Sequence, residues 1–249
     1  MSFRAATLNL ARNEKRWEER RELIVQQLAD LRPHVFALNE IWLPIQTGRW
    51  LQQRAKTQLG LSYALVEQPR AAEPSHPEAE GLLTAFPILE QSYRFFSGRD
   101  TVTLVVRLEI EGRTMDVYVT HLYPSRREES ERVSQVRELL AWIKERNDVE
   151  YRIVCGDCNA PLEADSMRLM AEAFRPTQIE PTAFTPLRNV DGEPTHPEWE
   201  RFDRCIDFIW ISESIRLLDG GRCFDKPSSR DESLWASDHV GVWADLDLV

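Results

Sequence analysis

The chain has 249 residues, of which 42% are hydrophobic and 29% charged, a composition typical of a folded globular protein rather than a disordered one. Asp and Glu total 41 against 31 Lys and Arg, so the formal net charge is −10. This acidic balance argues against a wide, non-specific nucleic-acid platform, because it repels phosphate backbones at long range. It does not argue against cleavage of a phosphoester, since a bound cation reverses the sign of the charge inside an acidic pocket.

The cysteines and the apolar runs bear on where the protein works. Cys155 and Cys158 form a C-x-x-C pair, a spacing that redox and zinc motifs use. No second such pair and no pair of histidines completes a zinc set, so we interpret Cys155 as a buried strand residue and Cys158 as a loop residue. The first residues lack the apolar core of a secretory signal, and no apolar run reaches membrane-spanning length. We therefore expect a cytoplasmic protein without integral membrane association, and we expect it to be a monomer.

Strand and helix patterns alternate along the first part of the chain. Apolar periodicity predicts a strand over residues 3–10, a helix over 18–31, a strand over 35–38 and a helix over 47–59. Thr47 is expected to be the N-cap of the second helix, and Gly60 its stop. The three prolines of residues 67–79 indicate a surface loop, after which strand character resumes over 82–85.

The remainder of the chain contains the clearest strand signal. Alternating apolar residues over 102–110 and 115–119, separated by Glu111 and Gly112, predict an antiparallel hairpin. Further along we expect a helix over 129–146, a strand over 152–155, a short helix over 166–174, a long loop over 175–203, and strands over 205–211 and 240–246. Mixed strands and helices place the chain in the α/β (α+β) class. No repeat or Gly/Ser-rich linker divides it, so residues 1–249 are expected to form a single domain.

Polar residues suited to metal or phosphate chemistry lie at or beside the ends of nearly all the expected core strands. They are Asn9, Glu40, His121, Asp157, Asn159, Asp207, Asp238 and His239. Groups at the rim of a rigid sheet can hold the fixed geometry that catalysis requires. Each residue taken alone could be an ordinary turn or strand-capping residue, since Asn and Asp favour turns. Eight together indicate a functional site.

Seven short motifs follow one another along almost the whole chain. They are Thr7-Leu8-Asn9, Asn39-Glu40, Glu80-Gly81, Thr120-His121-Leu122, Gly156-Asp157-Cys158-Asn159, Ile206-Asp207-Phe208-Ile209 and Ser237-Asp238-His239. This set, in this order, resembles the endonuclease/exonuclease/phosphatase superfamily, and its G-D-x-N and S-D-H motifs are the most specific parts. Cys158 stands where that superfamily more often has an aromatic residue, and Asn39 where it more often has Gln. Neither departure removes a catalytic group.

The resemblance implies a four-layered sandwich, in which two mixed β-sheets pack face to face with helices outside. It also implies a Mg²⁺ or Mn²⁺ site with Glu40 as the main ligand, and with Asp238 and Asn9 near the ion, where Asn9 would also contact the substrate. The chemistry of these residues agrees, because hard divalent cations prefer carboxylate and amide oxygens together with water. A metal ion bound to phosphate oxygens withdraws charge and stabilises the leaving oxyanion.

The resemblance leaves two assignments open for the base that activates water. In one, Asp157 holds the water with help from Asn159. In the other, His239 is the base and Asp207 orients its imidazole. We favour Asp157, with the Asp207–His239 pair binding and neutralising the phosphate. His121 is expected to donate a hydrogen bond to a non-bridging phosphate oxygen of the substrate.

Three kinds of phosphate-ester substrate remain open. A nuclease would cut DNA or RNA and could use aromatic residues near the pocket, such as Trp42 and Trp50, although either could be a core residue. A phosphodiesterase or phosphatase would act on a small or lipid-linked substrate; the acidic balance favours it, and residues 237–241 resemble sphingomyelinase-like members. A repair enzyme that cleaves DNA at abasic sites is the third kind, but the sequence shows no basic, DNA-penetrating loop to support it. A non-catalytic interaction module would be expected to lose a metal ligand or the His-Asp pair, and this chain retains all of them.

Other polar residues have ordinary interpretations. Three histidines beside or within proline-containing segments are interpreted as solvated and without a role: His34, His76 and His196. Four arginines could form a local basic patch for a substrate phosphate: Arg126, Arg127, Arg132 and Arg137. Neighbouring Glu residues on the same expected helix favour ordinary ion pairs one turn apart instead.

Overall fold

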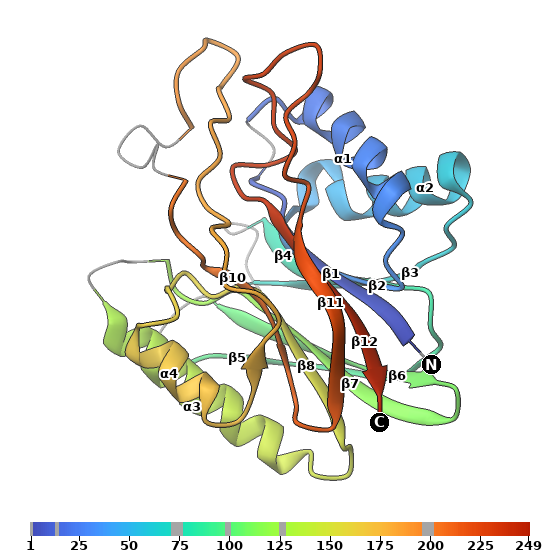
Figure 1. The fold of residues 1–249 in the computed structure, drawn as a ribbon, viewed down its shortest axis with the longest axis vertical. Helices are drawn as coiled ribbons and strands as arrows, with labels where there is room; N and C mark the ends of the chain where they lie inside the picture. Colours follow the sequence, from blue (N-terminus) through green and yellow to red (C-terminus); the bar gives the residue numbers. More distant parts are fainter. Residues whose placement is uncertain (1, 13–14, 71–76, 98–100, 125–127, 196–201) are drawn as a thin grey trace.

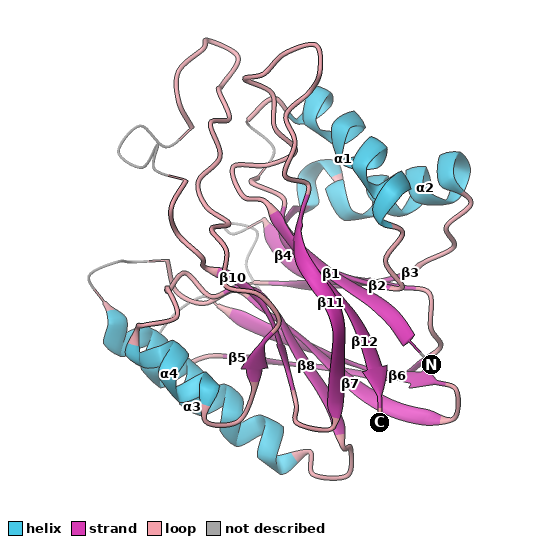
Figure 2. Cartoon of the chain, in the orientation of Figure 1, coloured by secondary structure: helices cyan, strands magenta, loops and turns pink. Residues whose placement is uncertain are grey.

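The computed structural model describes residues 2–12, 15–70, 77–97, 101–124, 128–195 and 202–249. Two six-stranded mixed sheets pack face to face, and helices cover the outer face of each (Figure 1 and Figure 2). The predicted four-layered sandwich is therefore confirmed. Within the described residues, no helix combines the length and the apolar character needed to cross a bilayer.

The first sheet has the strand order β11-β12-β1-β2-β4-β3. Its strands are β1 (Ser2–Asn9), β2 (Val35–Trp42), β3 (Ala64–Pro69), β4 (Glu78–Thr84), β11 (Ile215–Cys223) and β12 (Gly241–Leu248). β1 and β2 are parallel, and the other neighbours run antiparallel. Helices α1 (Trp17–Leu31) and α2 (Thr47–Leu59) lie against its outer face, and a short 3-10 helix, η1 (Leu43–Ile45), leads into α2.

The second sheet has the strand order β5-β6-β7-β8-β10-β9. Its strands are β5 (Ile88–Phe95), β6 (Val102–Ile110), β7 (Arg113–Thr120), β8 (Tyr151–Asp157), β9 (Arg175–Pro176) and β10 (Asp207–Ile211). Here β7 and β8 form the parallel pair, and the other neighbours are antiparallel. Helices α3 (Glu129–Glu145) and α4 (Asp165–Ala171) cover the outer face.

The period-two alternation of the strands sorts apolar side chains between three clusters. In β1, Phe3 and Ala5 point into the core between the two sheets, whereas Ala6 and Leu8 pack on the side of α1 and α2. A third cluster lies between the second sheet and its helices α3 and α4. Because apolar side chains occupy both faces of each sheet, the strand ends are the places where polar groups can gather.

Four strands of the structure were not predicted, and each lies at an edge of its sheet: β3, β5, β9 and β11. β5 lies at the edge of its sheet and has mostly exposed side chains, so no apolar alternation marks it. β11 is also an edge strand, and it carries Gly220 and Gly221 together with exposed polar residues. The short β9 falls within the loop predicted over 175–203. Edge strands need apolar side chains on one face at most, which weakens the pattern that sequence analysis detects.

Two local predictions around α2 and β4 were wrong. The loop predicted over 67–79 is shorter, because β3 continues to Pro69 and β4 begins at Glu78; residues 71–76 lie outside the described part. Thr47 is not the N-cap of α2, since Gln46 takes that position in a left-handed conformation. The Thr47 hydroxyl instead accepts a hydrogen bond from the Trp42 N–H at 2.8 Å. Gly60 ends α2 as predicted, at φ 68°.

Candidate active site

Strand ends from both sheets meet at one edge of the sandwich. Parallel pairing sets Asn9, the last residue of β1, beside Asn39 of β2, and Glu40 follows at once. In the second sheet the antiparallel register places Asp157 directly opposite Asp207. Register therefore brings the predicted residues to one rim, although they come from distant parts of the chain.

Asp157 lies at the centre of this cluster and is almost completely buried. Its Oδ2 accepts a hydrogen bond from Asn9 Nδ2 at 3.2 Å, and it lies 3.6 Å from His121 Nε2 and 3.9 Å from His239 Nε2. Burial and the neighbouring Asp207 carboxylate raise the pKa of Asp157 to about 6, against the opposing effect of the two histidines. Its carboxylate is therefore more basic than an ordinary aspartate, yet ionised at neutral pH.

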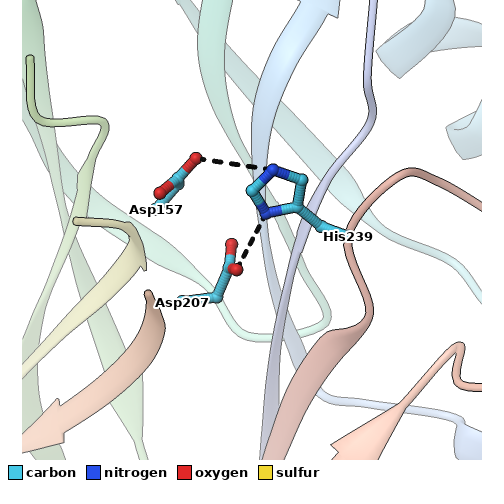
Figure 3. Close-up of side chains that lie close together, drawn as sticks. All are labelled: Asp157, Asp207 and His239. Atoms are coloured by element: carbon cyan, nitrogen blue, oxygen red, sulfur yellow. Dashed lines mark hydrogen bonds and ion pairs between the residues drawn. The ribbon is translucent and has the colours of Figure 1, made fainter. Parts of the chain in front are cut away.

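His239 and Asp207 form a buried pair, with Nδ1 of the imidazole 2.8 Å from Asp207 Oδ2 (Figure 3). Burial alone would lower the pKa of His239, but Asp207 and Asp157 outweigh it and raise that pKa to about 10. The Thr182 hydroxyl accepts the main-chain N–H of Asp207 at 3.1 Å, which fixes the start of β10. The ring of Phe184 packs edge-on against the imidazole at 5.2 Å. At neutral pH this pair presents an imidazolium to the site.

Asn9 connects Glu40 to Asp157. Its Nδ2 donates to Glu40 Oε1 as well as to Asp157 Oδ2, both at 3.2 Å. Its Oδ1 accepts the Ala11 N–H at 2.9 Å, so the amide nitrogen rather than the oxygen faces the carboxylates. In this geometry Asn9 holds the two carboxylates together as a donor.

Glu40 and Asp238 each contact a cationic side chain. Glu40 Oε2 accepts the Arg12 main-chain N–H at 3.1 Å and lies 3.7 Å from Arg12 Nε. Asp238 Oδ2 lies 2.6 Å from Lys15 Nζ. Burial favours the neutral form of Glu40, but His121, Arg12 and Lys15 outweigh burial and lower the pKa of that carboxyl. Glu40 and Asp238 thus form a negatively charged region that attracts cationic groups.

Asn159 and His121 complete the predicted set. The Asn159 main-chain N–H donates to Asp157 Oδ1 at 2.8 Å, and its side-chain Nδ2 donates to the Leu122 carbonyl at 2.9 Å. Asn159 thereby orients Asp157 and holds the segment that follows β7. Burial and Arg70 lower the pKa of His121, but Glu80 and Asp157 outweigh them and raise it. All eight predicted site residues therefore lie in one connected cluster.

Sequence analysis assigned no role to Asn39 and Glu80, which lie in the same network. Asn39 Nδ2 donates to Glu80 Oε2 and to the Thr120 carbonyl, and its Oδ1 accepts the Asp157 N–H at 2.9 Å. Asn39 of the first sheet thus anchors the C-terminal end of β8 in the second. The sequence could have indicated both residues, because Asn39 directly precedes Glu40 and Glu80 belongs to the Glu80-Gly81 motif.

Gly156 is required by the same contact between the sheets. Its φ is 132°, and a Cβ at this position would lie 2.0 Å from the Thr120 carbonyl oxygen and 2.9 Å from Asn39 Oδ1. Only glycine can adopt this conformation without displacing the neighbouring strand. The glycine of the G-D-x-N motif therefore lets β8 approach β7 and Asn39.

Several residues considered in the sequence lie outside the cluster. His34 is half-buried rather than simply solvated, and its Nδ1 accepts the Arg4 N–H at 3.0 Å. Trp50 packs against Trp17 at 6.0 Å and belongs with the helices of the first sheet. Arg132 forms an ion pair with Glu129, three residues before it on α3. Cys155 and Cys158 are buried and unpaired, Cys155 on β8 and Cys158 just after it. Four residues named above lie outside the described part: His76, Arg126, Arg127 and His196.

The cluster contains groups that can hold a cation. Among the described residues, ligand atoms of Asp157, Asp207 and His239 all lie within 4.8 Å of one another. The 2.8 Å bond between Asp207 and His239 already engages one ligand atom of each residue. Glu40 and Asp238 supply the two further carboxylates, and hard divalent cations prefer such oxygen donors. The residues present therefore fit a divalent metal ion.

Comparisons with known proteins agree with this geometry. The sequence profile described as the Endonuclease/Exonuclease/phosphatase family matches residues 6–239. An endonuclease/exonuclease/phosphatase protein from Bacteroides vulgatus is similar in structure, with a TM-score of 0.79 and 16% identity, covering 100% of both chains. The human Nocturnin catalytic domain with bound sulfate anion has a TM-score of 0.74 and 21% identity, covering 100% of this chain and 95% of that one.

A third similar structure is a humanized TDP2 from D. rerio, with a TM-score of 0.76 and 17% identity, covering 99% of both chains. No match was found among curated protein sequences. Structural likeness at these identities shows the fold, whereas the family profile covers nearly the whole chain and includes every predicted site residue. The chain belongs to the endonuclease/exonuclease/phosphatase family, whose members are divalent-metal-dependent hydrolytic phosphoesterases.

Proposed function

We propose that this protein hydrolyses phosphodiesters with a bound Mg²⁺ or Mn²⁺ ion, as a nuclease or phosphodiesterase, through water activated by Asp157. The observation that carries the proposal is the position of Asp157. Its buried carboxylate contacts Asn9, His121 and His239, and these come from the rims of both sheets. A carboxylate next to two imidazoles combines a base with donors for phosphate oxygens.

Glu40 and Asp238 would hold the metal ion, with Asn9 beside them. When bound, the ion polarises the phosphoryl group and stabilises the charge that develops on the leaving oxygen. Asn9 supports this arrangement because its Nδ2 donates to both Glu40 Oε1 and Asp157 Oδ2, each at 3.2 Å, and so holds the two carboxylates close together. A turn of its amide would bring its oxygen toward the ion, at the cost of the Ala11 hydrogen bond.

Asp157 would orient a water molecule and accept its proton. The water oxygen forms the new bond to phosphorus, the bond to the leaving oxygen breaks, and the water proton passes to the carboxylate. A pKa of about 6 supports this role, because a general base is most effective when its pKa lies near the working pH. The main-chain N–H of Asn159 fixes the carboxylate at 2.8 Å, so that one oxygen remains directed at the site.

His239 and His121 would bind the phosphate. A pKa of about 10 makes His239 an imidazolium at neutral pH, which suits a ligand for a non-bridging oxygen better than a base. Asp207 stabilises that charge and orients the ring. His121 Nε2 lies 3.6 Å from the same Asp157 oxygen, and its Nδ1 lies 3.6 Å from Glu80 Oε1. The alternative in which His239 is the base requires a neutral imidazole.

Hydrolysis of bis-p-nitrophenyl phosphate in the presence of Mg²⁺ or Mn²⁺ tests this assignment. Glu40→Gln and Asp157→Asn are each expected to reduce turnover at least about a hundredfold without changing thermal unfolding by more than a few degrees. Asp165→Asn removes an equal charge from the exposed start of α4 and is the matched control. Full activity in EDTA would reject the metal site, and an active Asp157→Asn variant would reject the base.

A small-molecule or lipid head-group diester is the second candidate substrate. The net charge of −10 favours it, because an acidic protein gains no long-range attraction for a polyanion. A panel of plasmid DNA, RNA, bis-p-nitrophenyl phosphate and sphingomyelin vesicles separates the two. Preference for nucleic acid over the small diester supports the nuclease, and the reverse order supports the second candidate. Failure on the whole panel with metal present would favour a non-catalytic interaction module.

A further inference from the structure

The segment between β1 and α1 directs two cationic side chains at the carboxylates of the candidate metal site. Lys15 Nζ lies 2.6 Å from Asp238 Oδ2, and both side chains are largely buried, with 24% and 4% of their surfaces exposed. Arg12 lies closer to Glu78, at 3.0 Å, than to Glu40, at 3.7 Å. Lys15 is thus in close contact with a proposed metal ligand, whereas the Arg12 guanidinium has its shorter ion pair with Glu78.

The position of Lys15 depends on a buried arginine. Arg20 of α1 is fully buried, and its guanidinium donates to five main-chain carbonyls. The five acceptors belong to Leu10, Ala11, Arg12, Lys15 and Ala236. One side chain therefore holds the main chain of Lys15 and a carbonyl two residues before Asp238.

This shared anchor distinguishes the Lys15–Asp238 pair from an ordinary surface ion pair. A surface lysine loses conformational freedom when it pairs, and such contacts contribute little. Here the main chains on both sides of the pair are already fixed by Arg20, and the carboxylate is buried. The contact is therefore built into the fold of the site.

We propose that Lys15 is an internal competitor of the metal ion for Asp238 and that it sets the metal affinity of the site. The inference rests on the metal site proposed above. An ammonium group and a divalent cation that contact the same carboxylate repel each other strongly in a buried site. Metal binding at Asp238 therefore weakens or displaces the Lys15 contact, and this cost lowers the metal affinity.

The same competition favours divalent over monovalent ions. A monovalent ion that replaces the ammonium gains no more charge interaction with Asp238 than it displaces. A divalent ion has about twice the electrostatic attraction to the Asp238 oxygen that the ammonium group has, and it can also bind Glu40. Lys15 thus acts as a selectivity-determining residue, through a contact with a metal ligand rather than with the substrate.

Direct measurement of Mn²⁺ binding tests the proposal without relying on activity. We expect Lys15→Met to bind Mn²⁺ about tenfold more tightly than the wild type in calorimetry or electron paramagnetic resonance, or about 1.4 kcal/mol. Arg16→Met is the matched control, because Arg16 carries the same charge one residue away but pairs with Glu19 and Asp231. It is expected to leave the dissociation constant within about twofold.

The sign of the effect decides between competition and support. If Lys15 instead orients Asp238 for the metal, Lys15→Met weakens Mn²⁺ binding, and an unchanged affinity is equally incompatible with the proposal. Lys15→Gln provides a second variant in case the methionine disturbs folding, which thermal unfolding monitors. In an Asp238→Asn background the effect of Lys15→Met should disappear.

Wild-type protein and Glu40→Gln separate this inference from the proposed function. If the wild type binds no Mn²⁺, the metal site and the competition both fail. If the wild type binds Mn²⁺, Glu40→Gln abolishes that binding and Lys15→Met fails to tighten it, only the competition is overturned. If Lys15→Met binds Mn²⁺ more tightly and the Arg16→Met control does not, the result supports both the metal site and the competition.

Discussion

The Asp207–His239 pair makes the stability of the protein depend on pH in a defined direction. The folded-state pKa of His239 is about 10, against an ordinary value of 6.5 in the unfolded chain. A raised pKa means that the pair stabilises the folded protein fully below pH 6.5 and loses this contribution as pH rises toward 10. Substituting His239 by Gln, which retains an amide donor for Asp207, removes the titrating group.

The size of the effect follows from the two pKa values. At about 1.36 kcal/mol for each pKa unit, the difference between 6.5 and about 10 corresponds to at most about 5 kcal/mol of unfolding free energy. Asp157 titrates near 6 and is already ionised over this interval, so it adds little to the wild-type change. Cysteine and tyrosine titrations occur in both proteins and cancel in the difference.

Urea unfolding of the metal-free protein between pH 6.5 and 10 measures this difference. The wild type should lose several kcal/mol more than His239→Gln over the interval. Loss of the imidazolium also raises the pKa of Asp157, so the comparison is repeated in an Asp157→Asn background, where the difference should persist but shrink. Parallel stability curves for wild type and His239→Gln would refute the charged pair.

Three further predictions concern the same rim. The pH profile of kcat/KM should fall below about pH 6 as Asp157 is protonated, with the midpoint moved lower by bound metal; a profile that stays flat down to pH 4 would exclude Asp157 as the base. Gly156→Ala should destabilise the protein by about 2 kcal/mol or more in urea unfolding, because its Cβ would meet the Thr120 carbonyl, and an unchanged midpoint would contradict that contact. Arg20→Met should lower the unfolding free energy by about 3 kcal/mol or more, since five carbonyls lose a buried donor, whereas Arg21→Met, next to it on α1 but partly exposed and paired with Glu18, should change it by less than about 1 kcal/mol.

Local sequence patterns were sufficient to predict the helices and central strands of the layers and the polar residues at the rim. The hairpin of β6 and β7 alternates apolar residues strongly, and the helices carry apolar residues at the spacing of one buried face, so their positions follow from burial alone. Asn9, Asp157 and Asp207 stand at strand ends, where a sheet buried on both faces leaves space for polar groups. The edge strands β3, β5 and β11 were missed because an exposed strand needs no regular alternation, and β9 was missed because it has only two residues.

The connections between the rim residues could be known only once the two sheets were packed. Asn39 reaches Asp157 across 118 residues of sequence, and Lys15 reaches Asp238 across 223. Nothing in the local sequence distinguishes Lys15 or Arg20 from other charged residues near the start of a helix. Arg20 and Lys15 both reach the loop before β12, at the Ala236 carbonyl and the Asp238 carboxylate, and these pairings depend on how the layers stack rather than on propensity or periodicity. Side-chain chemistry and strand position predict which groups gather at the rim, whereas the packing of the two sheets decides which of them touch.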